Sequence, residues 1–384
     1  MRVNLGALLA GIMVIGLSAT EVTIPSFDMR DFSDLDKKGA LVEGVRNALH
    51  EYGFFALTNT GLDVDLIHRT FSTADQFFKL PVELKSKIDG KSTNYQRGYI
   101  PMFKESAKGV KVGDYKEFLH IGRERDPEHA ERVHSWPNLW PDFFDLKSDV
   151  AQYRKALDDN TQEVCHILAL ALGEEETFFD EGMVDSESLL RIIRYPAPAN
   201  ELNRGTIWAA AHTDIDLFAI LPQATADGLE VQLGDGTWLP VRAEADSMII
   251  NAGDFLEIFS NGYFKSAVHR VKSPEGNVEG ERLSMVYFAH PRSEVVLSPR
   301  PQWVEEAGGV QKYAEATRWE MLMERLADLG LATDEMLKEL ADCKLMERLM
   351  KYGRESEKAL RSLKEHGYAS EVVLERLNQL EGEV

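Results

Sequence analysis

Two histidines and one aspartate in the second half of the 384-residue chain have the residue types that bind a transition metal. His212 and Asp214 lie two positions apart in the segment His-Thr-Asp, and His269 follows later in the chain. Two imidazoles and one carboxylate form the ligand set that binds Fe(II) on one face and leaves the other face open. Side chains two positions apart on a strand point to the same side, so His212 and Asp214 can converge on one ion. His269 must then come from another strand that folding brings alongside.

A second pair with this spacing, Arg282 and Ser284, lies on the apolar segment 282–289 and also predicts two side chains on one face of a strand. A lone His-x-Asp is weak evidence, because a buried histidine bonded to a backbone carbonyl is common. The order of the motifs is more specific. His-x-Asp is followed by a buried strand pattern that ends in a turn (247–254), the turn signal Asn261-Gly262, the lone His269 and then Arg-x-Ser.

Short strands that alternate with turn signals through the middle of the chain predict a jelly roll, the double-stranded β-helix. The predicted fold class is mainly β with flanking helices, with an N-terminal α/β region before the core and a helical tail after it. Four segments are expected. They are an N-terminal extension (1–19), the α/β region (20–145), a support helix with the jelly-roll core (146–300) and a C-terminal helical extension (301–384).

The motifs together resemble the isopenicillin N synthase-like group of 2-oxoglutarate/Fe(II) oxygenases, most closely its bacterial branch, from about residue 22 to about residue 331. The segments that carry the resemblance are Ala210–Asp216, Leu221-Pro222, Ala226–Glu230, Asp235–Pro240, Asn251–Asp254, Ser260–Gly262, His269–Val271 and Arg282–Met285. Thr213 and Asp216 depart from the pattern, because many bacterial relatives have Glu and Asn there. Both departures spare the ligands and bear on substrate preference.

The resemblance implies an Fe(II)- and 2-oxoglutarate-dependent dioxygenase in which His212, Asp214 and His269 are the catalytic metal ligands. It also implies that Arg282 and Ser284 bind the distal carboxylate of 2-oxoglutarate. Tyr195 is expected near that co-substrate, with a structural role in the barrel wall as the alternative. The implied reaction uses O2 to hydroxylate, desaturate or demethylate a small molecule and releases succinate and CO2. The resemblance does not identify the prime substrate.

The polar segment 92–123 is where the resembled family lines or supports the substrate entrance. On this basis the expected substrate-binding residues are Arg97, Tyr99, Lys116 and Phe118. The alternative is a long loop whose charges pair with one another or face water, since surface loops carry recognition and also most variation.

Three other functions remain as alternatives. One is an Fe(II) oxidase that does not use 2-oxoglutarate, of the isopenicillin N synthase or aminocyclopropane-carboxylate oxidase type, because such enzymes also have Arg-x-Ser. A zinc hydrolase with the same His/Asp set is disfavoured, since no further general base lies beside His212 and Asp214. A non-catalytic scaffold is disfavoured because the ligand set is intact.

The composition is that of an ordinary globular protein and argues against a nucleic-acid partner. The formal net charge of −21 disfavours nucleic acid, whose phosphates would be repelled. Cys165 and Cys343 lie far apart in sequence, so neither a disulfide framework nor a zinc site is expected.

The segment 1–19 has the form of a secretory signal peptide or of a spurious extension, and it is too short for a stable membrane span. The cytoplasm is the expected location, with the periplasm or secretion as the alternative.

The C-terminal tail, which begins after about residue 331, where the family pattern ends, is not part of that pattern. A helix over 313–329 is expected to be followed by three more, over 334–352, 355–366 and 371–380, each with an apolar stripe. Stripes of this extent must be buried, either on the support helices of the barrel or against a second copy of the chain in a homodimer.

Overall fold

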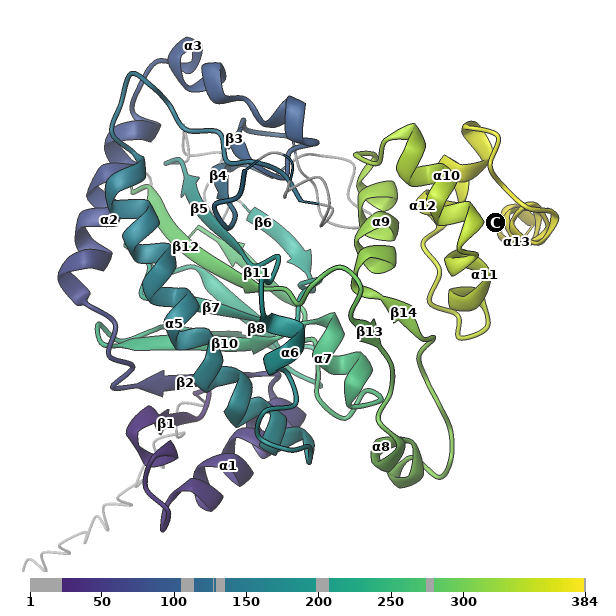
Figure 1. Cartoon of the computed structure of the whole chain (residues 1–384), viewed down its shortest axis with the longest axis horizontal. Helices are drawn as coiled ribbons and strands as arrows, with labels where there is room; N and C mark the ends of the chain where they lie inside the picture. Colours follow the sequence, from purple (N-terminus) through teal and green to yellow (C-terminus); the bar gives the residue numbers. More distant parts are fainter. Residues whose placement is uncertain are drawn as a thin grey trace, which may run out of the picture.

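The structure is a computed structural model, and it describes residues 23–104, 114–126, 128, 135–197, 207–273 and 280–382. Its main sheet has eight strands (Figure 1), which in spatial order are β1 (Ser26–Asp28), β2 (Phe54–Thr58), β10 (Ser247–Ala252), β7 (Phe218–Pro222), β12 (Arg282–Ala289), β5 (Leu189–Tyr195), β4 (Glu117–Ile121) and β3 (Gly98–Ile100). A second sheet has, in order, β6 (Ile207–His212), β11 (His269–Lys272), β8 (Leu229–Gln232) and β9 (Trp238–Pro240). A small pair is formed by β13 (Val296–Leu297) and β14 (Ala316–Thr317).

The two larger sheets enclose one apolar core, as a double-stranded β-helix requires, so the predicted fold is confirmed. Both sheets contribute to this core, with Ile193 and Ile249 from the main sheet and Val231 and Val271 from the smaller one. Because successive side chains on a strand point to opposite faces, every strand of the main sheet has an inner face and an outer face. Strands β1 to β4 of the N-terminal region belong to the main sheet and extend it at both edges.

Helices cover the outer face of the main sheet and share a second apolar core with it. The three long ones are α1 (Lys38–Glu51), α2 (Val64–Phe78) and α5 (Lys147–Leu172). The shorter helices of this part of the chain are α3 (Val82–Lys85), α6 (Asp180–Met183), α7 (Asp254–Phe259) and α8 (Pro301–Glu306). The support helix α5 ends at Gly173, whose φ of +84° is a left-handed conformation that glycine adopts without steric cost. In the described part of the chain no helix combines the length and apolarity needed to cross a membrane.

The C-terminal helices form a compact unit of their own beside the barrel (Figure 1). They are α9 (Arg318–Leu329), α10 (Asp334–Asp342), α11 (Leu345–Met350), α12 (Glu357–Glu365) and α13 (Glu371–Gly382). Their apolar stripes meet in a third core that includes Met323 of α9, Leu340, Leu360 and Leu377. The stripes therefore pack on one another and on α9, which neither of the two expected arrangements described.

Two predicted helices of this region are wrong in their extent. The helix expected over 313–329 begins only at Arg318, because Ala316 and Thr317 before it pair with β13. The segment 334–352 was expected to be a single helix, but α10 ends at Asp342 and α11 begins at Leu345. Lys344, between them, has a φ of +55°, which breaks the helical path and turns the chain back. Thr333 caps the start of α10, where its hydroxyl accepts a hydrogen bond from the Met336 N–H.

Candidate functional site

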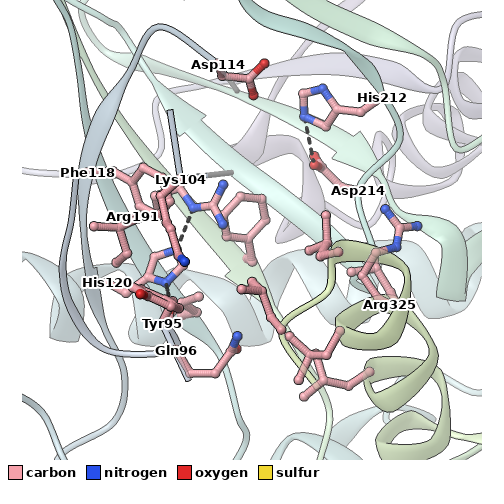
Figure 2. Close-up of a pocket in the computed structure, with 18 of the residues that line it drawn as sticks. Tyr95, Gln96, Lys104, Asp114, Phe118, His120, Arg191, His212, Asp214 and Arg325 are labelled. Atoms are coloured by element: carbon pink, nitrogen blue, oxygen red, sulfur yellow. Dashed lines mark hydrogen bonds and ion pairs between the residues drawn. The ribbon is translucent and has the colours of Figure 1, made fainter. Parts of the chain in front are cut away.

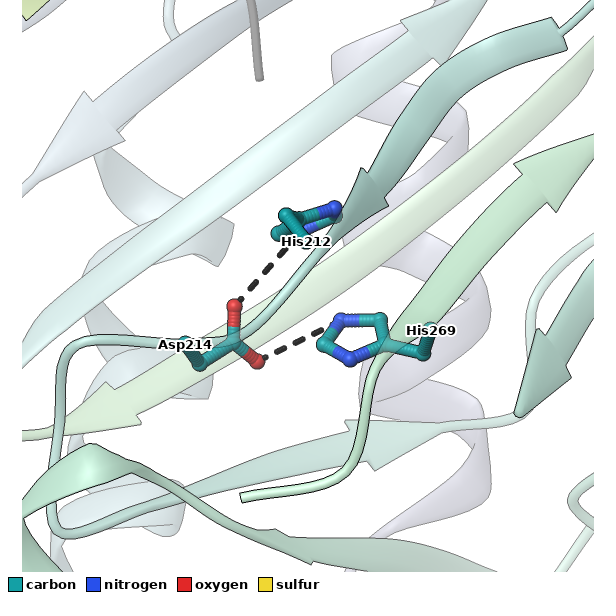
Figure 3. Close-up of side chains that lie close together, drawn as sticks. All are labelled: His212, Asp214 and His269. Atoms are coloured by element: carbon teal, nitrogen blue, oxygen red, sulfur yellow. Dashed lines mark ion pairs between the residues drawn. The ribbon is translucent and has the colours of Figure 1, made fainter. Parts of the chain in front are cut away.

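The three predicted metal ligands converge at one end of the barrel (Figure 3). His212 is the last residue of β6 and lies directly opposite His269, the first residue of β11, in the antiparallel ladder. Asp214 follows β6 and is buried between them, with its carboxylate oxygens 3.7 Å from His212 Nε2 and 3.5 Å from His269 Nε2. One ligand atom from each residue lies within 4.8 Å of the other two, a spacing that one metal ion can bridge.

Hydrogen bonds from neighbouring groups orient all three side chains toward this centre. Nδ1 of His212 lies 2.7 Å from the Ala210 carbonyl, and Nδ1 of His269 lies 3.1 Å from the Ala267 carbonyl. A carbonyl can only accept, so each Nδ1 carries the hydrogen and each Nε2 has a free lone pair. The amide of Asn251 donates to Asp214 Oδ2 at 2.9 Å, which holds the carboxylate in place. Such outer partners fix the tautomer and orientation of metal ligands.

The electrostatics of the cluster favour the protonation states that a metal requires. Burial, followed by repulsion from His269, lowers the pKa of His212 to about 4, so its imidazole is neutral at physiological pH. Burial alone would raise the pKa of Asp214, but His269, His212 and Asn251 together bring it below the usual value. Neutral imidazole and ionised carboxylate are the ligand forms that bind a divalent cation. The buried donor set therefore suits Fe(II).

A second pocket, lined by Arg282 and Ser284, lies further along the barrel interior. Arg282 is buried, and its Nε donates to the Ala226 carbonyl at 3.0 Å. Its Nη1 is buried and has no hydrogen-bond partner among the described residues. A buried guanidinium with an unsatisfied donor is costly unless an anion completes it, so this pocket suits the distal carboxylate of 2-oxoglutarate. Tyr195 lies opposite Arg282 in the β5–β12 ladder, with its ring centre 5.2 Å from the guanidinium.

A third feature, which we call the iron-side pocket, opens next to His212 and Asp214 (Figure 2). Its lining comes from the inner face of the main sheet, from the loop after β6 and from α9. The lining residues include Tyr95, Gln96, Ile100, Lys104, Asp114, Lys116, Phe118, His120, Leu189, Arg191, Phe288, His290, Leu322, Arg325, Leu326 and Leu329.

Two of the four residues expected at the substrate entrance, Lys116 and Phe118, line this pocket. They are two positions apart and point to the inner face with Arg191 of the neighbouring strand. Lys116 pairs with Asp114 at 2.9 Å, and the Phe118 ring lies 4.5 Å from the Arg191 guanidinium.

The other two, Arg97 and Tyr99, are not among the residues that line the pocket. Tyr99 pairs with Leu119 across the β3–β4 ladder and packs in the outer core, where its hydroxyl donates to Glu117 at 2.6 Å. Arg97 is buried, with Nη2 3.1 Å from the Ser135 hydroxyl. Its guanidinium packs against Gly122, where a Cβ would lie only 2.2 Å from Nε of Arg97. The structure thus gives both side chains roles in packing outside the pocket.

Sequence reasoning missed Arg191, Phe288, His290 and Arg325 as pocket residues. A signal existed for two of them, because Arg191 is four positions before Tyr195 and Phe288 is four positions after Ser284, each on one strand. His120 is a further pocket residue that the sequence motifs did not indicate. It lines the pocket, where its Nδ1 donates to the Tyr95 carbonyl at 2.9 Å and its Nε2 accepts from Arg191 at 2.6 Å.

Two family models match the chain. Residues 24–143 match the N-terminal region described as non-haem dioxygenase in morphine synthesis, and residues 186–291 match the 2OG-Fe(II) oxygenase superfamily. The second match contains the three candidate metal ligands together with Arg282 and Ser284.

Similar proteins come from fungi, plants and bacteria. The 2-oxoglutarate-Fe(II) type oxidoreductase hxnY of Emericella nidulans is 31% identical over 78% of this chain and 88% of its own length. A 2OG-Fe(II) oxygenase family protein from Caulobacter crescentus superposes with a TM-score of 0.71 at 33% identity, over 79% of this chain and 98% of that one. A full-length Neurospora crassa protein in complex with α-ketoglutarate and thymine has a TM-score of 0.70 at 27% identity, over 81% of this chain and 98% of that one. With this fold, this ligand geometry and these relatives, the chain belongs to the 2OG-Fe(II) oxygenase superfamily and is an Fe(II)- and 2-oxoglutarate-dependent oxygenase of small molecules.

Proposed function

We propose that His212, Asp214 and His269 hold the catalytic Fe(II) and that Arg282, with Ser284 and Tyr195, holds the distal carboxylate of 2-oxoglutarate. The single observation that carries this assignment is the convergence of two Nε2 atoms and one carboxylate within 4.8 Å, each oriented by a partner of its own. The buried Nη1 of Arg282, unsatisfied among the described residues, supports the second half of the assignment.

In this proposal the prime substrate occupies the iron-side pocket, with Lys116 and Phe118 on one wall and α9 on the other. When bound, Fe(II) and 2-oxoglutarate supply the oxidising chemistry, in which O2 converts 2-oxoglutarate to succinate and CO2 while the substrate is hydroxylated, desaturated or demethylated. The chain's own residues position these groups and exclude water. The apolar side chains Ile100, Phe118 and Leu326 line the pocket and would exclude water from the walls they form once a substrate is bound.

The deciding experiment adds Fe(II) and then 2-oxoglutarate to the metal-free protein under anaerobic conditions. A weak visible charge-transfer band is expected when the co-substrate chelates the metal, with one Fe(II) per chain. Without a band at saturating 2-oxoglutarate, the proposed co-substrate site would be refuted in favour of an oxidase that does not use it. Zinc-dependent hydrolysis has no observation in its favour.

Three finer proposals concern the context of the enzyme. Placement in the bacterial branch is supported by the Caulobacter crescentus protein, although fungal and plant relatives are of comparable identity. Cytoplasmic location is supported only by the supply of Fe(II) and 2-oxoglutarate there, and residues 1–19 lie outside the described part of the chain.

A homodimer through the C-terminal helices is supported by Val372 and Leu374 of α13, which remain 50% and 37% exposed. Light scattering of the double variant Val372→Glu/Leu374→Glu tests the dimer, which should dissociate.

A further inference from the structure

The iron-side pocket is cationic although the protein is strongly acidic. Its described lining contains four cationic side chains, Lys104, Lys116, Arg191 and Arg325, but only two carboxylates, Asp114 and Asp214, in a chain whose formal net charge is −21. Asp114 pairs with Lys116 at 2.9 Å, and Asp214 is assigned to the metal. With Fe(II) and the dianion 2-oxoglutarate bound, the charges of those two groups cancel. The lining then keeps an excess of positive charge, which attracts an anion.

Arg325 is the cation best placed to meet a substrate near the metal. It lines the pocket together with His212, Thr213 and Asp214 and projects from α9 toward Asp214 (Figure 2). Its Nη2 forms an ion pair with Asp254 Oδ2 at 3.3 Å. Its Nε is buried and has no hydrogen-bond partner among the described residues. A guanidinium has five N–H donors, so this side chain retains capacity for a second carboxylate.

Apart from Arg325, the residues by which α9 lines the pocket are leucines. Leu322 lies three residues before Arg325 and Leu329 four residues after it, which places both on the same helical face, and both line the pocket together with the adjacent Leu326. Ile100 and Phe118 line the pocket from the sheet. A planar cationic group on an otherwise apolar wall suits a ligand with one anionic end and an apolar body, because low solvent exposure strengthens the charge-assisted hydrogen bonds.

We propose that the prime substrate is a small amphipathic carboxylic acid whose carboxylate binds Arg325 and whose apolar body lies against α9 and the inner face of the sheet. This inference rests on the proposed function and adds the substrate class to it. The planar fork of arginine matches a carboxylate through two parallel hydrogen bonds, which a neutral amide of the same shape cannot form. Arg325 is thus the specificity-determining residue, positioned by Asp254 on one side and by the packing of α9 on the other.

The test compares two probes of the same size and shape, phenylacetate and phenylacetamide. Each is titrated by calorimetry into the anaerobic protein loaded with Fe(II) and saturating 2-oxoglutarate, and the charge-transfer band is recorded in the same samples. The wild-type protein should bind phenylacetate at least tenfold more tightly than phenylacetamide. Arg325→Gln should abolish this preference, while Arg325→Lys should keep only part of it. Arg361→Gln, which removes an exposed arginine of α12 that pairs with Glu357, should leave the preference unchanged.

A second variant removes the risk that Arg325→Gln disturbs folding by leaving Asp254 unpaired. Arg325→Gln combined with Asp254→Asn removes both charges of the pair and should give the same loss of preference. Equal affinity for the two probes in the wild-type protein, no binding of either one, or a preference that survives in both Arg325 variants would overturn the inference. A preference for phenylacetate without a charge-transfer band would contradict the proposed co-substrate site but leave the substrate class standing.

Discussion

The barrel and the C-terminal helical unit differ in how their cores relate to chemistry. The barrel core is interrupted by buried polar side chains, including Asp214, Asn251, His269 and Arg282, which come from segments far apart in sequence. The core of the helical unit consists mainly of leucine, methionine and alanine side chains, with Trp319 and Val373, from helices that follow one another along the chain. Buried polar groups occur there too, and Ser356 donates to Asp328 within the same unit. Buried polar groups lower the stability of the barrel, but they are the groups that bind the metal and the co-substrate. The helical unit has no such ligands to hold, and its core contributes to stability.

The two regions meet at α9. One side of this helix contributes Trp319, Met323 and Ala327 to the core of the helical unit, while Leu322 and Arg325 line the iron-side pocket. Metal and co-substrate binding should therefore depend on the barrel alone, and the shape of the substrate wall should depend on the helical unit as well. The predictions below test this division, from the largest expected effect to the smallest.

Removing a metal ligand should have the largest effect. We expect His212→Ala or His269→Ala to weaken Fe(II) binding by more than about 100-fold. Loss of a residue that only hydrogen-bonds to a metal ligand typically costs about 10- to 100-fold, and loss of the ligand itself should cost more. Anaerobic titration measures it, and the thermal unfolding of the helical unit should not change. Tight stoichiometric binding in both variants would mean that the metal site is elsewhere.

Loss of the co-substrate cation should come next. Arg282→Leu should weaken 2-oxoglutarate binding by about 100-fold or more, because removing one member of a buried ion pair costs about 3–5 kcal/mol. The charge-transfer band, titrated with 2-oxoglutarate, reports this change, and the Fe(II) stoichiometry should remain one per chain. An unchanged band would show that another cation binds the co-substrate.

Truncation after Leu331 should separate the two regions. It removes α10 to α13 and exposes Trp319, Met323 and Ala327 on α9. We expect lower thermal stability and a more mobile substrate wall, with Fe(II) and 2-oxoglutarate binding retained. Calorimetry of unfolding and the two titrations above measure these properties. A truncated chain that binds neither group would show that the barrel site needs the tail.

A single substitution in the tail core gives a milder version of the same test. Leu360 is fully buried, so Leu360→Ala should cost about 2–5 kcal/mol of unfolding free energy. Leu35→Ala is the matched control, because Leu35 is 91% exposed and its substitution should change stability by less than about 1 kcal/mol. Urea unfolding of both variants measures the difference, and equal losses would argue against the observed packing.

The smallest effect concerns Asp216, where the family resemblance leads us to expect Asn. Both its carboxylate oxygens are buried without partners among the described residues. Burial, then repulsion from Asp214 and Asp254, raises its pKa well above the usual value. The folded chain keeps a proton that the unfolded chain releases near pH 4, so stability falls as pH rises above that value.

Asp216→Asn should therefore stabilise the protein by about 1–3 kcal/mol at neutral pH and by less at pH 4. Thermal unfolding at both pH values checks this, and equal gains would contradict the assigned cause.

The sequence by itself determined the parts of the site that depend on local periodicity. Residues two apart on a strand share a face in any fold, so His212 could be grouped with Asp214, and Arg282 with Ser284, before their surroundings were known. The apolar segment 282–289 coincides with the observed strand β12, and the strand pattern at 247–254 contains β10, because apolar residues predominate in both strands. The ordered motifs then indicated the family.

Tertiary structure alone decided which face each strand turns inward and what covers the site. The strand Gly98–Ile100 has apolar side chains on both faces, so its pairing with β4, and not its own pattern, sends Tyr99 outward and Ile100 into the pocket. Arg325 lies more than a hundred residues after Asp214 and carries no local signal that it lies beside the metal ligands. An amphipathic stripe predicts that a helix face is buried but not which partner buries it, because that choice depends on contacts between segments distant in the chain.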